Sequence, residues 1–199
     1  FLRYGCAVIR GAIDLSVQAN VRSAIDAAYL ANQSLHVYDR DIEAVTEGEI
    51  SGWEMVDTPL LQGFLELAFA DQHWRRELVT ARRIQGVNAN RDWQNPLQLH
   101  LDSQLHNFLF TVNFWVPFDP CGIDAPSLEL VPLDYKSTRE YSGFTEELQR
   151  EGEEFQCGHF RAGALDAAAV TEEFGPNCFL RPAMNPGDLI VSSNWIIHG

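Results

Sequence analysis

One long alternating segment sets the architecture of the second half of the chain: Phe108-Leu-Phe-Thr-Val-Asn-Phe-Trp-Val-Pro-Phe118. Its alternation of side chains predicts a long strand with one buried face. Shorter extended segments are predicted around it, at residues 82–87, 97–102, 127–131 and 189–197. The last two follow the turn signals Asp124-Ala-Pro126 and Asn185-Pro-Gly-Asp188, which are typical of reversals between antiparallel strands.

The first half of the chain reads mainly as helix. Residues 1–10 predict a short apolar strand that Gly11 closes, and Asp14 or Ser16 is expected to cap a helix that runs to about Asn32. Four residues at helical spacing give that helix a buried stripe: Val17, Val21, Ile25 and Ala28. The polar, aperiodic residues 33–57 predict a loop.

Thr58-Pro59 marks the start of a second helix, because a capping hydroxyl precedes a proline in the first turn. Residues 71–79 predict a further helical segment. The apolar face of the second helix is expected to comprise Leu60, Leu61, Phe64, Leu65 and Ala68.

Helices followed by antiparallel strands favour a mainly β fold with a helical layer. The expected architecture is a β-sandwich or jelly roll whose N-terminal helices pack on one sheet. The chain has 199 residues and no internal repeat, which predicts a single domain over residues 1–199.

A long polar stretch at about residues 133–181 has two interpretations. It contains the run Thr145-Glu-Glu-Leu-Gln-Arg-Glu-Gly-Glu-Glu154, which is typical of a solvated helix and loops. Long loops in compact domains are often functional, so the stretch can instead be an insert that forms a lid over a site at the mouth of the barrel.

Charge and composition exclude several classes of function. The chain has 14 Lys+Arg against 28 Asp+Glu, a net charge of −14, and Lys136 is its only lysine. Such an acidic protein is poorly suited to a nucleic-acid backbone or an anionic membrane surface, so neither is expected as a partner. No apolar run approaches the ~18 residues of a membrane-spanning helix. The cysteines form no C-x-x-C pair, which favours reduced thiols and a cytoplasmic protein: Cys6, Cys121, Cys157 and Cys178.

His100-Leu101-Asp102 is the first feature with a chemical mechanism. In a strand, residues i and i+2 point to the same face, so the imidazole and the carboxylate would project together. A second imidazole from a neighbouring strand would complete a 2-His-1-carboxylate triad, which leaves one face of an octahedral Fe(II) ion open. His198 is the natural candidate because it ends the apolar segment 189–197; alternatively, it is a hydrogen-bonded core residue. His106 can line the same cavity, although a structural role is favoured.

Four motifs follow one another along the chain: Leu97-Gln-Leu-His-Leu-Asp102, Phe114-Trp-Val-Pro-Phe-Asp119, Ala125-Pro-Ser-Leu-Glu-Leu-Val-Pro132, and Asn185-Pro-Gly-Asp-Leu-Ile-Val191 with His198-Gly199. With the opening Tyr4-Gly-Cys-Ala-Val-Ile-Arg-Gly11, this order resembles the phytanoyl-CoA dioxygenase-like family of Fe(II)/2-oxoglutarate-dependent oxygenases. These proteins fold as a double-stranded β-helix, a cupin-like jelly roll. The resemblance covers residues 4–199 apart from residues 33–57 and 133–181.

The resemblance implies that His100, Asp102 and His198 are the iron ligands and form the catalytic centre, with 2-oxoglutarate as cosubstrate. Trp115 falls where the family often has a cosubstrate-contacting tryptophan, although a tryptophan in a barrel strand is commonly core. Gln85 precedes the His-x-Asp segment, where some members place a polar residue against 2-oxoglutarate. Halogenating relatives lack the carboxylate, so Asp102 implies hydroxylation of a small organic substrate by O2, with release of succinate and CO2.

Two features depart from the family pattern. After Val131-Pro132 the chain continues with Leu-Asp-Tyr135, where the family usually has a Gly-Ser-His-like turn. The family's arginine for the distal carboxylate of 2-oxoglutarate lies about ten residues beyond the second histidine, so the chain is expected to continue past Gly199 into a strand that carries it. Three arginines are conceivable substitutes: Arg82, Arg83 and Arg181.

Two other functions fit the same residues. A cupin-like metalloenzyme would use Zn or Mn without an oxoacid, and dependence of turnover on 2-oxoglutarate distinguishes it from the oxygenase. A non-catalytic jelly-roll module would bind a metal or ligand only, and it would not need the arginine beyond Gly199.

Overall fold

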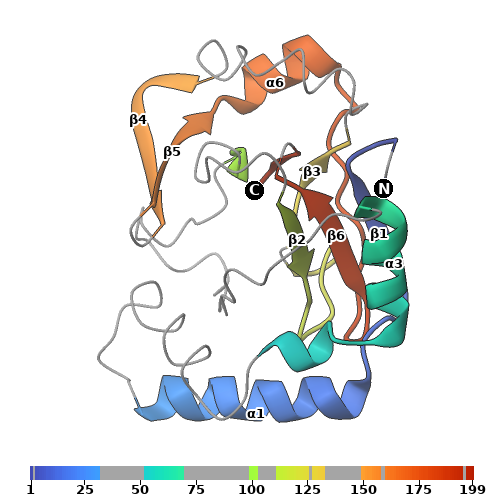
Figure 1. The fold of residues 1–199 in the computed structure, drawn as a ribbon. Coiled ribbons are helices and arrows are strands. Elements are labelled where there is room, and N and C mark those ends of the chain that lie inside the picture. Colours follow the sequence, from blue (N-terminus) through green and yellow to red (C-terminus); the bar gives the residue numbers. More distant parts are fainter. Residues whose placement is uncertain are drawn as a thin grey trace.

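The fold is given by a computed structural model that describes residues 1, 3–31, 52–69, 99–102, 111–125, 127–132, 149–157, 160–194 and 196–199 (Figure 1). These residues form short antiparallel sheets and three α-helices. The helix expected at residues 71–79, the strand expected at residues 82–87 and most of the loop expected at residues 33–57 lie outside the described residues.

A three-stranded antiparallel sheet joins the beginning of the chain to its end. Its order is β1-β6-β2, where β1 is Cys6–Ile9, β6 is Leu189–Ser193 and β2 is Val112–Trp115. Every residue of the central strand β6 is buried, and its apolar first half, Leu189 to Val191, suits a strand with neighbours on both sides.

Cross-strand pairing divides the side chains of this sheet between two faces. One face carries Ala7, Val191 and Phe114, which lie directly opposite one another on neighbouring strands. Residues one position along point to the other face. That second face carries two rows of three residues: Cys6, Ser192 and Asn113, and then Val8, Ile190 and Trp115.

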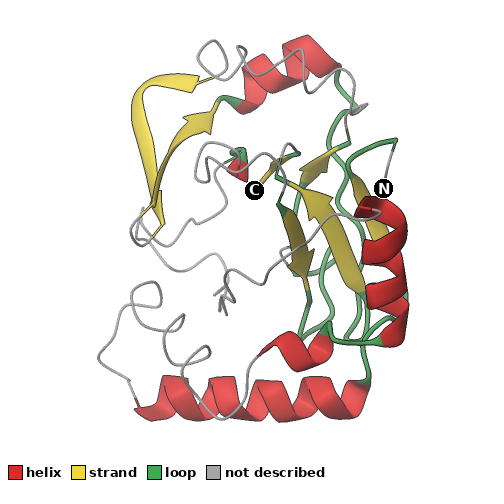
Figure 2. Cartoon of the chain, viewed as in Figure 1, coloured by secondary structure: helices red, strands yellow, loops and turns green. Residues whose placement is uncertain are grey.

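Helices cover the first face of the sheet (Figure 2). They are α1 (Leu15–Ala31), the short 3₁₀ helix η1 (Gly52–Met55) and α3 (Pro59–Phe69). Together with β6 they bury one apolar cluster, against which Val17 and Ile25 of α1 also pack: Ala12, Ile13, Val21, Met55, Val56, Leu61, Leu189 and Val191. Burial of this apolar surface is what holds the helices on the sheet.

The starts of α1 and α3 confirm two capping predictions. Asp14 Oδ1 accepts a hydrogen bond from the amide of Ser16 at 2.7 Å, and Thr58 Oγ1 accepts one from the amide of Leu61 at 3.3 Å.

The predicted apolar face of α3 is wrong at Leu60, which is 58% exposed. Leu60 lies about 100° around the helix from the buried Leu61, outside the stripe that faces the sheet.

A second group of strands lies against the other face of the sheet. β3 (Leu130–Val131) pairs with β7 (Ile197–His198), and isolated bridges extend this pair through His100 on one side and Leu180 on the other. An apolar cluster joins this group to the first sheet, with Val8 and Trp115 packed on it: Leu128, Leu130, Met184, Ile190 and Ile196.

The predicted single strand at residues 189–197 is wrong, because the chain turns within it. β6 ends at Ser193, and β7 begins at Ile197 in a different sheet. Asn194 fixes the turn through two hydrogen bonds with Thr111. The backbone N–H of Asn194 donates to the carbonyl of Thr111 at 3.0 Å, and the side-chain Oδ1 of Asn194 accepts from the backbone N–H of Thr111 at 3.4 Å. The turn places His198 in the second group of strands.

The polar stretch at residues 133–181 contains regular structure. β4 (Gln149–Cys157) and β5 (Phe160–Leu165) form an antiparallel hairpin, so the solvated helix is wrong for residues 149–154. Pairing with β5 outweighs the local preference of the charged run. The hairpin leads into α6 (Ala167–Phe174), which Asp166 caps.

Part of the same stretch belongs to the core rather than to a lid. Leu165 and Val170 are buried in an apolar cluster with residues of the second strand group: Leu99, Leu101, Leu165, Val131, Val170 and Ile197. A lid formed by the remainder of residues 133–181 stays a prediction.

All strand pairs among the described residues are antiparallel, as a jelly roll requires. The described strands form sheets of two and three strands, so the jelly roll itself stays a prediction.

None of the described helices is long and apolar enough to cross a membrane. Cys6, Cys121 and Cys178 are free thiols. The cytoplasmic location stays a prediction.

Asp188, in the turn before β6, joins that turn to the residues that follow β1. Its Oδ2 accepts hydrogen bonds from Arg10 Nη1 at 2.7 Å and from the amide of Asn185 at 2.9 Å, and its Oδ1 accepts one from the amide of Gly11 at 3.0 Å. The residue is 7% exposed. Burial alone would raise the pKa of Asp188, but these hydrogen bonds and the charge of Arg10 lower it below its ordinary value.

We expect Asp188→Ala to lower the free energy of unfolding by roughly 2–3 kcal/mol, because two backbone amides lose a buried acceptor. Urea unfolding followed by circular dichroism measures the change. Asp124→Ala removes an exposed carboxylate and is the matched control, with an expected change within about 0.5 kcal/mol. Equal stability of the two variants would contradict the role of Asp188.

The same carboxylate predicts a pH dependence of stability. Because the pKa of Asp188 is lower in the folded than in the unfolded chain, its contribution is fully present above the unfolded value of ~3.9. The contribution is lost as the pH falls through the lower folded value. The difference in unfolding free energy between wild type and Asp188→Asn should therefore shrink below about pH 4. A difference that stays constant on acidification would refute this.

Candidate metal centre

The two histidines predicted as metal ligands lie directly opposite each other on paired segments. The amide of His100 donates to the carbonyl of His198 at 2.8 Å, and the amide of His198 donates to the carbonyl of His100 at 3.0 Å. Residues that exchange both hydrogen bonds in an antiparallel pair project their side chains to the same face. The two imidazole rings are buried, with their centroids 4.4 Å apart.

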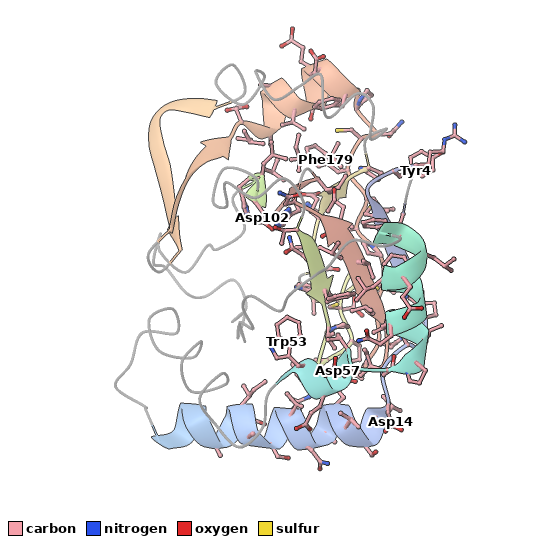
Figure 3. All side chains as sticks on the ribbon, viewed as in Figure 1. Tyr4, Asp14, Trp53, Asp57, Asp102 and Phe179 are labelled. Atoms are coloured by element: carbon pink, nitrogen blue, oxygen red, sulfur yellow. The ribbon has the colours of Figure 1, made fainter. Side chains whose placement is uncertain are left out.

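Asp102 completes the cluster from two positions beyond His100. Its Oδ1 lies 3.4 Å from His100 Nε2, and its Oδ2 lies 3.5 Å from His198 Nε2. One donor atom from each of the three residues lies within 4.8 Å of the others. The structure therefore brings together the three predicted ligands, with Asp102 beside β2 (Figure 3).

The residues between the ligands anchor the opposite face of these segments. Leu99 and Leu101 flank His100, and Ile197 precedes His198; all three are buried in the apolar cluster that α6 covers. Alternation along each segment thus sends the polar side chains to one face and the apolar ones to the other.

The spacing of the donors suits one transition-metal ion. Two donors at ~2.1 Å from an ion and ~90–110° apart are roughly 3.0–3.4 Å from each other. The separations of 3.4 Å from Asp102 Oδ1 to His100 Nε2 and of 3.5 Å from Asp102 Oδ2 to His198 Nε2 are each close to this range. Imidazole and carboxylate donors suit Fe(II), Zn and Mn alike, so the cluster fits a divalent transition metal without selecting one.

A backbone carbonyl sets the tautomer of His198. Its Nδ1 lies 2.9 Å from the carbonyl oxygen of Ile196. A carbonyl only accepts hydrogen bonds, so Nδ1 carries a proton, and Nε2 is the ring nitrogen that can bind a metal ion once it has no proton. This is the usual way in which a protein orients a metal-binding imidazole.

Asp102 is the anionic member of the cluster. Burial alone would raise the pKa of its carboxyl, but the hydrogen bond with His100, the charges of His198 and His100 and the amide of Asn113 hold it well below its ordinary value. The carboxylate is therefore ionised at neutral pH, as a metal ligand must be.

Asn113 is a site residue that sequence reasoning missed. It lies on β2, and its Nδ2 donates a hydrogen bond to Asp102 Oδ2. The available signal was a single amide within the alternating segment 108–118, two positions from Trp115 and hence on the same face. A polar residue on the inward face of a strand needs a buried partner.

The other predicted site residues have different outcomes. Trp115 is half-buried on the face of β2 that carries Asn113 and packs on the apolar cluster around Ile190, so its contact with 2-oxoglutarate stays a prediction. Gln85 and His106 lie outside the described residues, as do Arg82 and Arg83.

Arg181 does not face the cluster. Its side chain is 66% exposed, and its Nε donates to Glu129 Oε1 at 2.7 Å. Glu129 neighbours Leu130, which lies opposite His198, so the Glu129 side chain points to the other face of β3. Arg181 is therefore wrong as a substitute for the cosubstrate arginine.

We expect the protein, stripped with a chelator and titrated with Co(II), to bind one ion. His198→Ala should weaken this binding by at least ~100-fold, because loss of a direct ligand exceeds the effect of losing a residue that only orients one. Calorimetric titration gives the stoichiometry and affinity. Glu66→Ala, an exposed residue of α3, is the control; equal Co(II) affinity in both variants would exclude His198 as a ligand.

Comparison with known proteins adds no homologue: no protein-family model and no curated protein sequence matches the chain. The resemblance in motif order stays a prediction. Support for a function therefore comes first from the geometry of His100, Asp102 and His198.

Proposed function

We propose that the chain is an Fe(II)- and 2-oxoglutarate-dependent dioxygenase that hydroxylates a small organic molecule. The observation that carries the proposal is the convergence of His100, Asp102 and His198 on one face of paired antiparallel segments. Two imidazoles and one carboxylate are the ligands of non-haem Fe(II) oxygenases, and they leave coordination positions open for an oxoacid and O2. The motif order supports iron and 2-oxoglutarate over other metals and cosubstrates.

Each ligand has a defined task. With an ion bound, His100 and His198 would each donate a nitrogen atom of a neutral ring, and Asp102 would add one negative charge. With Fe(II) and 2-oxoglutarate bound, the centre would supply oxidation of a C–H bond to C–OH, with one oxygen atom of O2 entering the product and the other entering succinate as CO2 leaves.

An apolar residue of the second strand group lies beside His198. Leu130 lies opposite His198 and is fully buried, and it belongs to the cluster on which Trp115 packs. Such a layer keeps water away from the ligands and fixes their orientation.

The distal carboxylate of 2-oxoglutarate needs a cation, because a buried, unpaired carboxylate costs several kcal/mol. The arginines with described side chains have other partners: Arg3 lies over Tyr4, Arg10 binds Asp188, Arg22 binds Asp119 and Arg181 binds Glu129. The proposal therefore assigns this task to an arginine in another part of the protein, as the family resemblance implies.

Succinate release tests the proposal. The protein is incubated with Fe(II), ascorbate, O2 and 2-oxoglutarate across a panel of small organic substrates, and succinate is measured with and without each substrate. Turnover that needs Zn or Mn and ignores 2-oxoglutarate would favour the cupin-like metalloenzyme. Metal binding without any turnover would favour the non-catalytic module.

Asp102→Ala should abolish succinate-coupled hydroxylation while the protein stays folded, because the substitution removes the anionic ligand from a polar cluster rather than an apolar core contact. Circular dichroism and the melting temperature verify the fold. Glu172→Ala, an exposed carboxylate on α6, is the matched control and should keep full activity. Retained hydroxylation by folded, iron-loaded Asp102→Ala would contradict the assignment of Asp102 as a ligand.

A further inference from the structure

Asn113 approaches the cluster from the opposite sheet. It lies on β2, directly across from Ser192 of β6, whereas the three ligands come from β7 and from the segment of His100 that pairs with it. Its hydrogen bond to Asp102 is thus a polar contact between the two strand groups at the site.

The two oxygens of Asp102 have different surroundings. Oδ1 faces His100 Nε2 at 3.4 Å, and Oδ2 faces His198 Nε2 at 3.5 Å and also accepts the hydrogen bond from Asn113 Nδ2. The amide occupies a lone pair of Oδ2, which leaves Oδ1 as the oxygen with more freedom to bind a cation.

The binding mode of Asp102 decides how many coordination positions remain. A six-coordinate ion that took both carboxylate oxygens and two imidazoles would have two positions left. One that took a single oxygen would have three, the number that a chelating oxoacid and O2 need together.

We propose that Asn113 is a positioning residue that holds Asp102 as a monodentate ligand through Oδ1. This inference rests on the proposed metal site. Asn113 acts through Asp102 and has no contact of its own with the ion. With a six-coordinate ion bound, this would leave three coordination positions open.

Substitution tests the role of Asn113. Asn113→Leu keeps the approximate volume and removes the donor, and Asn113→Gln keeps an amide. We expect Asn113→Leu to weaken Co(II) binding about 10- to 100-fold and to change the visible spectrum of bound Co(II), with partial return of both in Asn113→Gln. Asn20→Leu, exposed on α1, is the matched control and should match wild type in both.

A measurement on the wild-type protein covers the case in which Asn113→Leu does not fold. Mn(II) bound to the protein should carry three exchangeable waters, counted from the broadening of its EPR lines in ¹⁷O-labelled water. Two waters would overturn the monodentate mode, as would wild-type Co(II) affinity and spectrum in folded Asn113→Leu; in either case the metal site would stand. Failure of the wild type to bind Co(II) or Mn(II) would overturn the metal site and the inference together.

Discussion

Two hydrogen bonds between the backbones of His100 and His198 place both imidazoles on one face of the protein. The side-chain period of a strand is two, so a slip of one residue would turn His100 toward α6 and bring Leu99 or Leu101 to the metal-binding face. Such a slip would bury an imidazole in an apolar cluster without a partner and expose leucine to the polar site. Burial of the leucines therefore enforces the register on which the ligand geometry depends.

The same chain reversal that delivers His198 also places Asn113. Asn194 binds the backbone of Thr111 in both directions, and Thr111 lies immediately before β2. Asn113 is two residues further along β2, where its side chain reaches Asp102. The crossing from β6 to β7 therefore fixes the separation of the two strand groups at the point where the carboxylate meets its amide partner. Fold and site share one set of contacts here, and Asp188 at the other end of β6 secures the turn that starts the strand.

Sequence patterns predicted the features that depend on interactions between residues close together in the chain. The caps at Asp14 and Thr58 and the shared face of His100 and Asp102 follow from interactions within a few residues, and all three are present. The turn at Asn194, the hairpin at residues 149–165 and the exposure of Leu60 depend on which segments meet in space, and periodicity does not encode that. Asn113 was missed for the same reason: its amide has a role only because β2 lies beside Asp102. His198 was predicted as the second imidazole because it ends an apolar segment and a metal site needs another ligand, but its backbone pairing with His100 was not predicted.

The charge of the protein and of the candidate site affects how the proposed cosubstrate would be attracted. A protein with a net charge of −14 repels anions at long range, and 2-oxoglutarate is a dianion. Two neutral imidazoles and one carboxylate leave a divalent ion with a net charge of about +1, whereas a second carboxylate ligand would cancel it. With an ion bound, a centre that has a single anionic ligand would therefore attract the anionic cosubstrate that we propose. Asn113 serves the same end, because a neutral amide supports Asp102 without adding negative charge to the site.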